Sequence, residues 1–430
     1  MKVLILGGAG KIGSAVAWDL VSRPEVTEVG LADRSHRALE RVRAWVNSPK
    51  ITLHRLDLTA EESSKRLMHR YDVGVIALPD RKTSYRAIEL AIDTGLNMVD
   101  ILEEYHRRPD KHETEDLTAN LVVPENMPVE QFLDEYGESL HTKAVAQGVT
   151  ILDGMGFAPG LSNVTLGEAI RKLDQTETAI ARVGGVPDKV AAQRHPLKYM
   201  ITWAFGHVLR EYVVKVNVRK GGQLVEVDAM TDWEPFRFTE FGIDEALECA
   251  ITPGMPSFIY TRPELQEFAE KTIRWPGHWQ GIAFLKECGM LDLEPVTLTG
   301  PVKGLLMEMT VKVAPREVLS AALTPRLEPR EGDTDICVMW STATGVKAGR
   351  RTRIDYYLWD KADTQNNISS MARVTGFTAA VSAVLLGRGE ITAKGIVAPE
   401  DGITGAAYQH LLAELEQKGI VIREIVRPID

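Results

Sequence analysis

Short apolar runs alternate with longer amphipathic stretches over the first 155 residues. The apolar runs predict strands that are covered on both faces, at 2–7, 28–33, 51–58, 73–79, 97–101 and 149–155. The stretches between them predict helices at 11–21, from about residue 60, at 83–94 and near 130–147. Parallel strands joined by helical crossovers form a doubly wound sheet, and ligands bind at the carboxyl ends of its strands. The pattern therefore predicts an α/β fold.

The pattern changes after "GFAPGLSN" at 156–163. Strand-like pieces follow, among them "AIARVGGVP" and "VVKVNVRKGGQLVEV", in which Gly221-Gly222 predicts a hairpin turn. Two further strand patterns flank a "GVKAGR" turn within 336–360, and a helix is expected near 316–323. These pieces predict an inserted α+β domain with a mainly antiparallel sheet.

From about Ile368 the chain becomes helical, apolar and rich in small residues up to Gly387-Arg388-Gly389. A helix this apolar must be buried, so we expect it to return to the first domain. The predicted units are a discontinuous nucleotide-binding domain (1–158 and 366–400), a substrate and dimerisation domain (159–365), and a C-terminal helix–strand appendage (401–430).

The segment between Glu103 and Glu138 is polar and irregular. Loops of this length are usually functional lids or mobile excursions. His106 and His112 within it could ligate a metal, but solvated loop histidines are the favoured interpretation, so no metal site is predicted.

Composition narrows the possible partners of the chain. The net charge of −10 over 430 residues argues against nucleic acid, which selects basic surfaces. No apolar run approaches the roughly 20 residues that cross a bilayer, and no signal peptide opens the sequence, so we expect a cytoplasmic protein. The cysteines Cys249, Cys288 and Cys337 are widely spaced, and buried free thiols are expected.

The first strand runs into a G-x-G-x-x-G pattern formed by Gly8, Gly10 and Gly13. In this pattern glycines allow a tight turn, close approach to a pyrophosphate and close packing of the following helix. Asp33 ends the second strand, where a carboxylate accepts hydrogen bonds from the adenosine ribose and repels a 2′-phosphate. NAD is therefore favoured over NADP, although Arg34 could bind that phosphate. The predicted cofactor site is Gly8, Gly10, Lys11, Ile12, Gly13, Asp33, Arg34, Asp57, Leu58, Ala77, Leu78 and Pro79.

Several motifs in order along the chain resemble the saccharopine dehydrogenase-like oxidoreductases. They are "VLILGGAGKIG", "GLADRS", "NMVDI", "GVTILDGMGFAPGLSN", "EKTIRWPGH" and "MARVTGFTAAVSAVLLGRGEITAKGI". Within this family the chain is most similar to the L-lysine 6-dehydrogenases. The resemblance implies a homodimer that oxidises an amine carbon with NAD. For lysine, the products would be ammonia and 2-aminoadipate 6-semialdehyde. A saccharopine or carboxynorspermidine-type secondary amine is the alternative substrate, and a dinucleotide sensor without catalysis is the alternative function.

Oxidation of an amine carbon by hydride transfer needs a proton acceptor near the reacting carbon and a cation for an amino-acid carboxylate. Arg274 is the predicted cation. His278 is the predicted proton carrier, because the ordinary pKa of histidine, about 6.5, suits proton transfer near neutral pH. The competing interpretations are that Arg274 forms an ion pair at the surface and that His278 only caps the Pro-Gly turn. Asp100 could orient the ammonium or the nicotinamide ribose. The expected substrate-binding residues are Phe157, Tyr199, Trp203, Thr252 and Ser257.

Overall fold

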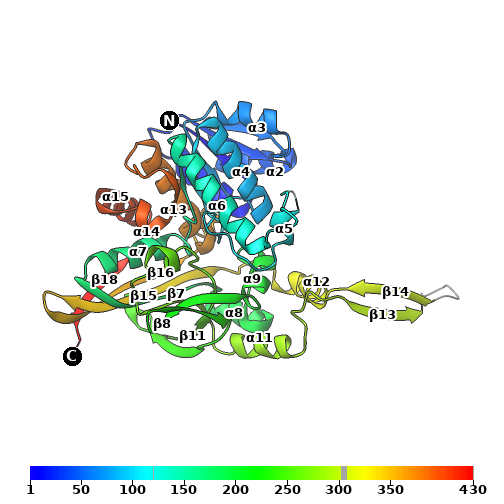
Figure 1. The fold of residues 1–430 in the computed structure, drawn as a ribbon, viewed down its shortest axis with the longest axis vertical. Coiled ribbons are helices and arrows are strands. Elements are labelled where there is room, and N and C mark those ends of the chain that lie inside the picture. Colours follow the sequence, from blue (N-terminus) through cyan, green and yellow to red (C-terminus); the bar gives the residue numbers. More distant parts are fainter. Residues whose placement is uncertain (120, 302–307, 430) are drawn as a thin grey trace.

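A computed structural model describes residues 1–119, 121–301 and 308–429 of the chain. Two sheets dominate it, one above the other in Figure 1, with the chain passing from the upper sheet to the lower one after residue 152 and returning at residue 370.

The first sheet has seven strands, all parallel, in the order β17-β6-β5-β4-β1-β2-β3. Its strands are β1 (Lys2–Leu6), β2 (Glu28–Asp33), β3 (Ile51–Arg55), β4 (Val73–Ile76), β5 (Asn97–Asp100), β6 (Thr150–Leu152) and β17 (Gly395–Val397). The predicted doubly wound sheet is confirmed. Strand β17 was not predicted, because its three residues carry too short a pattern to stand out.

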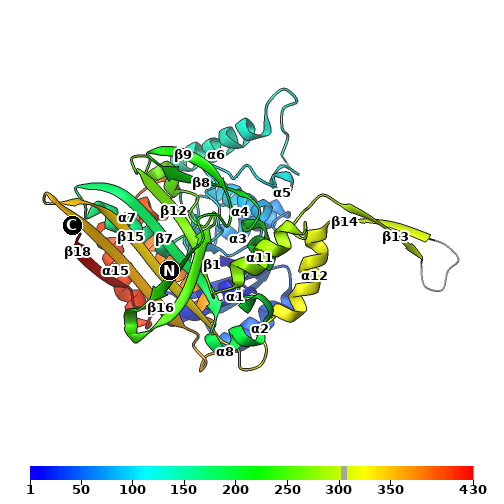
Figure 2. The same ribbon diagram turned by 90° about the horizontal axis from the view of Figure 1, so that it is seen from below.

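Helices cover both faces of this sheet (Figures 1 and 2). They are α1 (Lys11–Val21), α2 (His36–Val46), α3 (Glu61–Met68), α4 (Arg81–Thr94), α6 (Val129–Ala146) and α13 (Ser370–Gly387). The returning helix α13 packs on α1, β4 and β5. Its close fit depends on Gly376, where a Cβ would lie 2.9 Å from the Cβ of Ala15. By length and composition α13 could span a membrane, but 78% of it is buried in the fold, as in a core helix.

The second sheet has nine strands and is mostly antiparallel, with one parallel pair between β7 and β12. Its strands are β7 (Gln175–Pro187), β8 (Lys215–Lys220), β9 (Gln223–Asp228), β10 (Glu234–Phe238), β11 (Glu245–Ile251), β12 (Glu267–Arg274), β15 (Asp335–Lys347), β16 (Arg350–Lys361) and β18 (Arg423–Pro428). The predicted hairpins are confirmed as β8–β9, which turns at Gly221 and Gly222, and β15–β16. Strand β18 pairs with β16, so the C-terminal segment extends this sheet rather than standing apart.

Shorter helices surround the second sheet. They are α7 (Leu161–Arg171), α8 (Lys189–Arg194), α9 (Phe205–Glu211), α10 (Phe258–Thr261), α11 (His278–Glu287), α12 (Pro315–Leu327), α14 (Pro399–Gly402) and α15 (Gly405–Gln417), with 3-10 turns at Pro196–Lys198 and Glu240–Gly242. A ribbon of β13 (Val296–Pro301) and β14 (Glu308–Val313) projects from the body in both views (Figures 1 and 2).

Two expectations from the sequence are wrong. The 103–138 segment is not wholly irregular, because it contains the short α5 (Glu115–Thr118). Helix α6, which begins within this segment, confirms the helix predicted near 130–147. Cys288 is exposed at the end of α11, while Cys249 and Cys337 are buried as expected. The amphipathic α11 turns Cys288 away from the core.

Candidate active site

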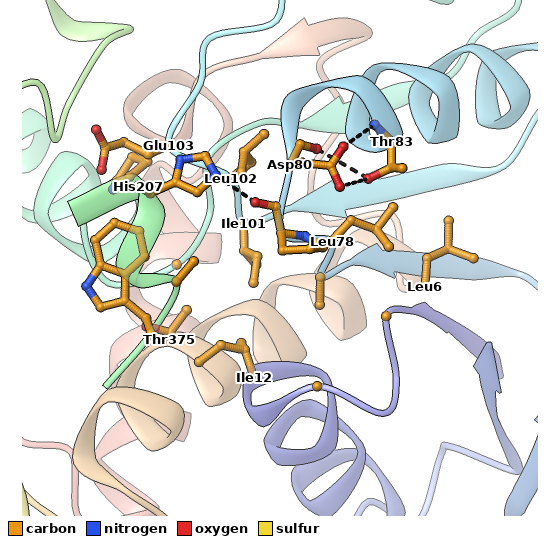
Figure 3. A pocket seen from close by; sticks show the side chains of 18 of the residues that line it. Leu6, Ile12, Leu78, Asp80, Thr83, Ile101, Leu102, Glu103, His207 and Thr375 are labelled. Atoms are coloured by element: carbon orange, nitrogen blue, oxygen red, sulfur yellow. Dashed lines mark hydrogen bonds between the residues drawn. The ribbon is translucent and has the colours of Figure 1, made fainter. Parts of the chain in front are cut away.

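A cavity of about 1180 Å³ lies between the two sheets, at the carboxyl ends of the parallel strands. Figure 3 shows Ile12, Leu78, Ile101 and Thr375 around this space, with Glu103 and His207 on one side of it. His207 reaches across from the second domain, and its Nε2 lies 2.6 Å from the carbonyl oxygen of Pro79. The cavity thus joins the predicted cofactor site to residues of the second domain.

The glycine turn between β1 and α1 forms one end of the cavity. Gly10 is the N-cap of α1 and lines the cavity, so its missing side chain leaves the helix N-terminus open to a ligand. Gly13 cannot be replaced without moving the turn, because a Cβ there would lie 2.3 Å from the carbonyl oxygen of Gly7. Gly8 packs on Leu31, and a Cβ at Gly8 would lie 3.0 Å from the Cβ of Leu31.

Ten of the twelve predicted cofactor residues line the cavity: Gly10, Lys11, Ile12, Asp33, Arg34, Asp57, Leu58, Ala77, Leu78 and Pro79. Gly8 and Gly13 lie behind it and shape the turn. Asp33 is held by the backbone N–H of Ser35, which donates to its Oδ1 over 3.0 Å. The open N-terminus of α1 could bind a pyrophosphate, and the Asp33 carboxylate at the end of β2 could bind a ribose. Both features fit a nicotinamide dinucleotide. Arg34, which also lines the cavity, is a cation that could bind a 2′-phosphate, so this geometry fits both NAD and NADP.

Arg274, at the end of β12, lines the other end of the cavity and is 3% exposed. Its Nε and Nη2 donate to the hydroxyl of Tyr212 over 3.3 and 3.1 Å, and Nη1 donates to the carbonyl of Ile273 over 3.0 Å. The guanidinium also lies over the rings of Tyr199 and Trp279. Among the described residues no carboxylate forms an ion pair with it. A buried cation whose hydrogen-bond partners are all neutral and that borders a cavity is suited to bind an anionic ligand.

Glu103 and Glu211 meet beside Arg274, although they come from the loop after β5 and the end of α9. Both side chains line the same part of the cavity, close enough for each carboxyl group to affect the pKa of the other. Burial and the neighbouring carboxyl raise the pKa of Glu103 well above its usual value. Burial raises the pKa of Glu211 to about 7, against the opposing effects of Glu103 and of the Arg274 charge. Burial therefore favours the protonated form of both carboxyl groups.

Glu270 is the third carboxyl group at this end of the cavity. Thr252 Oγ1 donates to its Oε2 over 2.6 Å, and the Gly254 N–H donates to the same oxygen over 3.1 Å. No N–H or hydroxyl donor in the described part of the chain reaches the buried Oε1. Burial raises the pKa of Glu270 to about 8. The group is held by one oxygen and leaves the other unused, as expected of a proton acceptor.

His278, the predicted proton carrier, does not line the cavity. It is 1% exposed, with Nδ1 2.9 Å from the carbonyl oxygen of Leu197 and Nε2 3.1 Å from the hydroxyl of Tyr212. Burial and the Arg274 charge lower its pKa to about 3, so it is neutral. The structure gives it a different place, as the support of the tyrosine that holds Arg274.

The structure divides the other candidates into two groups. Phe157 and Trp203 line the cavity. Four candidates are buried outside its lining, each with another structural contact: Asp100, Tyr199, Thr252 and Ser257. Asp100 caps the turn after β5 through the Leu102 N–H, Tyr199 lies under Arg274, Thr252 holds Glu270, and Ser257 donates to Glu400.

The expectation that His106 is a solvated loop residue is wrong, because its side chain is fully buried. Its Nδ1 lies 2.6 Å from Asp153 Oδ1, and its Nε2 lies 3.0 Å from the hydroxyl of Ser84, which donates to Asp100 over 2.6 Å. Donor atoms of Asp100, His106 and Asp153 lie within 4.8 Å of one another, a spacing that could hold a metal ion. Since these groups already bond to each other directly or through Ser84, we interpret the cluster as a brace beneath the loop that carries Glu103. His112 is half-buried and pairs with Asp110.

The His106–Asp153 pair should make folding stability depend on pH. Burial alone would lower the pKa of His106, but Asp153 outweighs it and raises the pKa to about 9. The raised value stabilises the fold fully below pH ~6.5, and this contribution is lost as the pH rises through about 9. We expect His106→Gln to lower the free energy of unfolding at pH 7 by roughly 1–3 kcal/mol. Chemical denaturation from pH 6 to 9.5 checks this, and an unchanged pH slope in the variant would contradict it.

The sequence alone did not predict Glu103, Glu211 and Glu270 as site residues. A usable signal existed for one of them: Glu270, Thr272 and Arg274 alternate along β12 and all line the cavity, as period-2 side chains on one face do. In the sequence, Glu103 is distinguished only as the start of a polar loop. Nothing in the pattern of α9 distinguishes Glu211 from a surface glutamate.

Comparisons with known proteins agree with this division of the chain. Residues 3–152 match the model of the saccharopine dehydrogenase NADP binding domain, and residues 156–420 match that of the saccharopine dehydrogenase C-terminal domain. A carboxyaminopropylagmatine dehydrogenase of a Synechocystis species is 20% identical over 99% of this chain and 98% of its own. An alpha-aminoadipic semialdehyde synthase of Arabidopsis thaliana is 26% identical over 38% of this chain, and the match spans 16% of that longer protein.

The fold has a solved counterpart as well. The apo saccharopine dehydrogenase (L-Glu forming) of Saccharomyces cerevisiae superimposes with a TM-score of 0.73 at 19% identity, over 99% of both chains. The two family models together reach every strand of both sheets except β18. The chain belongs to the saccharopine dehydrogenase family.

Proposed function

We propose that this protein is an NAD-dependent dehydrogenase that oxidises the amine-bearing carbon of a substrate that also carries a carboxylate. The observation that carries the proposal is that Arg274, Glu270, Glu103 and Glu211 all line the cavity whose other end is the glycine turn between β1 and α1. A sensor has no need of a buried arginine and three carboxyl groups beyond its nucleotide site. When bound, the nicotinamide dinucleotide supplies the hydride acceptor.

Arg274 holds the substrate carboxylate in this proposal. The Tyr212 hydroxyl and the rings of Tyr199 and Trp279 fix the guanidinium before substrate arrives. Little conformational entropy of the Arg274 side chain is therefore lost when substrate binds. The substrate carboxylate supplies a charged hydrogen-bond partner for the guanidinium.

Glu270 takes the proton that the amine must lose, because only a neutral amine can release a hydride from its carbon. The free Oε1 accepts this proton, while Thr252 and the Gly254 N–H keep the carboxyl group in place. A pKa of about 8 lies near the working pH, where a general base is most effective.

L-lysine oxidised at Cε is the first candidate substrate, on the resemblance of the sequence motifs. The carbon–hydrogen bond at Cε breaks and its electron pair leaves as hydride. Water then adds to the imine, and ammonia leaves 2-aminoadipate 6-semialdehyde. The second candidate is a carboxylated polyamine-type secondary amine, which the full-length similarity to carboxyaminopropylagmatine dehydrogenase favours.

Absorbance of the reduced nicotinamide tests the proposal with NAD or NADP and a panel of lysine, ornithine, saccharopine, diaminopimelate and polyamines. Reduction with one amine supports a dehydrogenase and selects between the two candidates. Tight cofactor binding with no reduction across the panel would favour the sensor instead.

The choice of NAD over NADP depends on Asp33. We expect Asp33→Ala to weaken NAD binding by about 10- to 100-fold, because about two charge-assisted hydrogen bonds to the ribose are lost. NADP should bind the same variant more tightly than wild type, since the repulsion of its 2′-phosphate is gone. Titration of both cofactors checks this, with Arg34→Ala as the matched variant, which should weaken only NADP. Unchanged affinities in Asp33→Ala would contradict the assignment.

A further inference from the structure

The ribbon of β13 and β14 has an apolar face that is exposed. In its register Val296 lies opposite Val313, and Leu298 lies opposite Val311. Directly opposed residues of an antiparallel pair point to the same side, as do residues two apart along a strand, so these four side chains share one face. In the described part of the chain the ribbon is a sheet of its own, and it projects from the body (Figures 1 and 2).

The opposite face of the ribbon is polar. It carries Thr297, Thr299, Thr310 and Lys312, and the hydroxyls of Thr299 and Thr310 lie 3.3 Å apart. One apolar and one polar face are typical of an antiparallel sheet that is packed on one side and solvated on the other. A two-stranded ribbon is only marginally stable in water by itself, so its apolar face needs a partner.

The root of the ribbon is fixed to the body. The backbone N–H of Arg316, at the start of α12, donates to the carbonyl oxygen of Asp292, just before β13, over 3.1 Å. The buried guanidinium of Arg316 donates to Oε1 of Glu113 over 2.8 Å, which ties the root to the loop before α5. These contacts hold the ribbon in a set direction away from the body.

Further exposed apolar side chains lie on the elements that lead into and out of the ribbon. They are Phe284 of α11, Leu293 after it and Val318 of α12, and with Val296, Leu298 and Val311 they are between 43% and 65% exposed. Together these six side chains expose roughly 300–500 Å² of apolar surface, as large as the patches that mark interaction sites. A standard interface takes about 800 Å² from each partner, somewhat more than half of it apolar. The ribbon and its root therefore supply about the apolar area that one partner contributes.

A second copy of this chain fits the apolar face better than lipid or a charged partner does. None of the described residues on that face is charged, so two copies meet there without like-charge repulsion. Two identical ribbons packed face to face form a four-stranded unit in two layers, in which each apolar face covers the other. Lipid fits less well, because both strands are edges whose unpaired N–H and C=O groups would lose their water.

We infer that the ribbon is a contact between two copies of this chain, and that the apolar faces of the two ribbons pack against each other across a two-fold axis. The exposed apolar side chains at each root extend the contact. The inference is independent of the proposed function, because none of the described ribbon residues lines the cavity. It gives the homodimer expected from the sequence a specific contact surface.

Sedimentation velocity of the full chain and of variants at Leu298 tests the inference. At micromolar concentration the wild type should sediment as a dimer. Leu298→Glu should sediment as a monomer, because two like charges would be buried in the contact, and we expect the dimer dissociation constant to rise at least about 100-fold. Thr299→Glu changes the neighbouring residue on the polar face and is the matched control, which should stay dimeric.

Leu298→Lys should be monomeric for the same reason. Mixing the Leu298→Glu and Leu298→Lys proteins should restore the dimer, because opposite charges then meet in the contact. A Leu298→Glu protein that stays dimeric, loss of the dimer in Thr299→Glu, or a mixture without dimer would each overturn the inference. So would a monomeric wild type, and its flotation with phosphatidylcholine vesicles would assign the face to lipid instead. Circular dichroism checks the fold, and if one variant at Leu298 misfolds, the other still decides against Thr299→Glu.

Discussion

Glu270→Gln should lower kcat by about 10²- to 10⁴-fold, the usual contribution of a general base. The amide keeps the shape of the group, and its oxygen still accepts from Thr252 and the Gly254 N–H, so fold and cofactor binding should remain. It cannot take a proton from the amine. The raised pKa of about 8 also predicts that kcat/KM of the wild type rises with pH through this region, since the base must be ionised.

Rate profiles from pH 6 to 10 check both parts of the prediction. In Glu270→Gln the rise near pH 8 should disappear, leaving only the titration of the amine itself. Glu264→Gln, at an exposed site just before β12, serves as the control and should keep the wild-type pH profile. A Glu270→Gln enzyme with near-normal kcat and an unchanged profile would assign the proton transfer to another group.

Arg274→Met should lower kcat/KM for a carboxylated substrate by about 30- to 1000-fold, which corresponds to the loss of about 2–4 kcal/mol from a buried charge pair. Methionine retains apolar contact with the rings of Tyr199 and Trp279 but offers no donor. Arg274→Lys should recover only part of the loss, because an ammonium cannot bind a carboxylate with two parallel hydrogen bonds.

The control for this prediction is a change of substrate. An analogue without the carboxylate should react poorly with the wild type and lose little further in Arg274→Met. If the variant lost equally on both substrates, Arg274 would act on the structure of the site and not on the carboxylate.

The nucleotide-binding half was predictable because its signals are local. An apolar strand, a glycine turn and an acidic residue at the next strand end lie within 33 residues, and each has a direct physical meaning. The antiparallel hairpins were predictable for the same reason, because Gly221-Gly222 and "GVKAGR" mark their own turns.

The end of the cavity around Arg274 was not predictable in this way, because it is assembled from distant segments. Glu103 belongs to the first domain, whereas Glu211 and Glu270 lie 59 residues apart in the second, on α9 and β12. Only the tertiary fold brings all three to one cavity. His278 was attractive because of its ordinary pKa, yet the helix that begins with it turns the ring toward Tyr212. Burial and a neighbouring arginine then remove the property that had suggested it. The homodimer and the cytoplasmic location stay predictions.

Isotope transfer tests the central claim most directly. The substrate that reduces the cofactor in the amine panel would be prepared with deuterium on the amine-bearing carbon, for lysine at Cε, and the reduced nicotinamide examined by mass spectrometry. The account predicts one deuterium in the reduced cofactor and a slower turnover of the labelled amine. A reduced cofactor without deuterium would show that the hydride leaves another carbon, and would contradict the assignment of this cavity to amine oxidation.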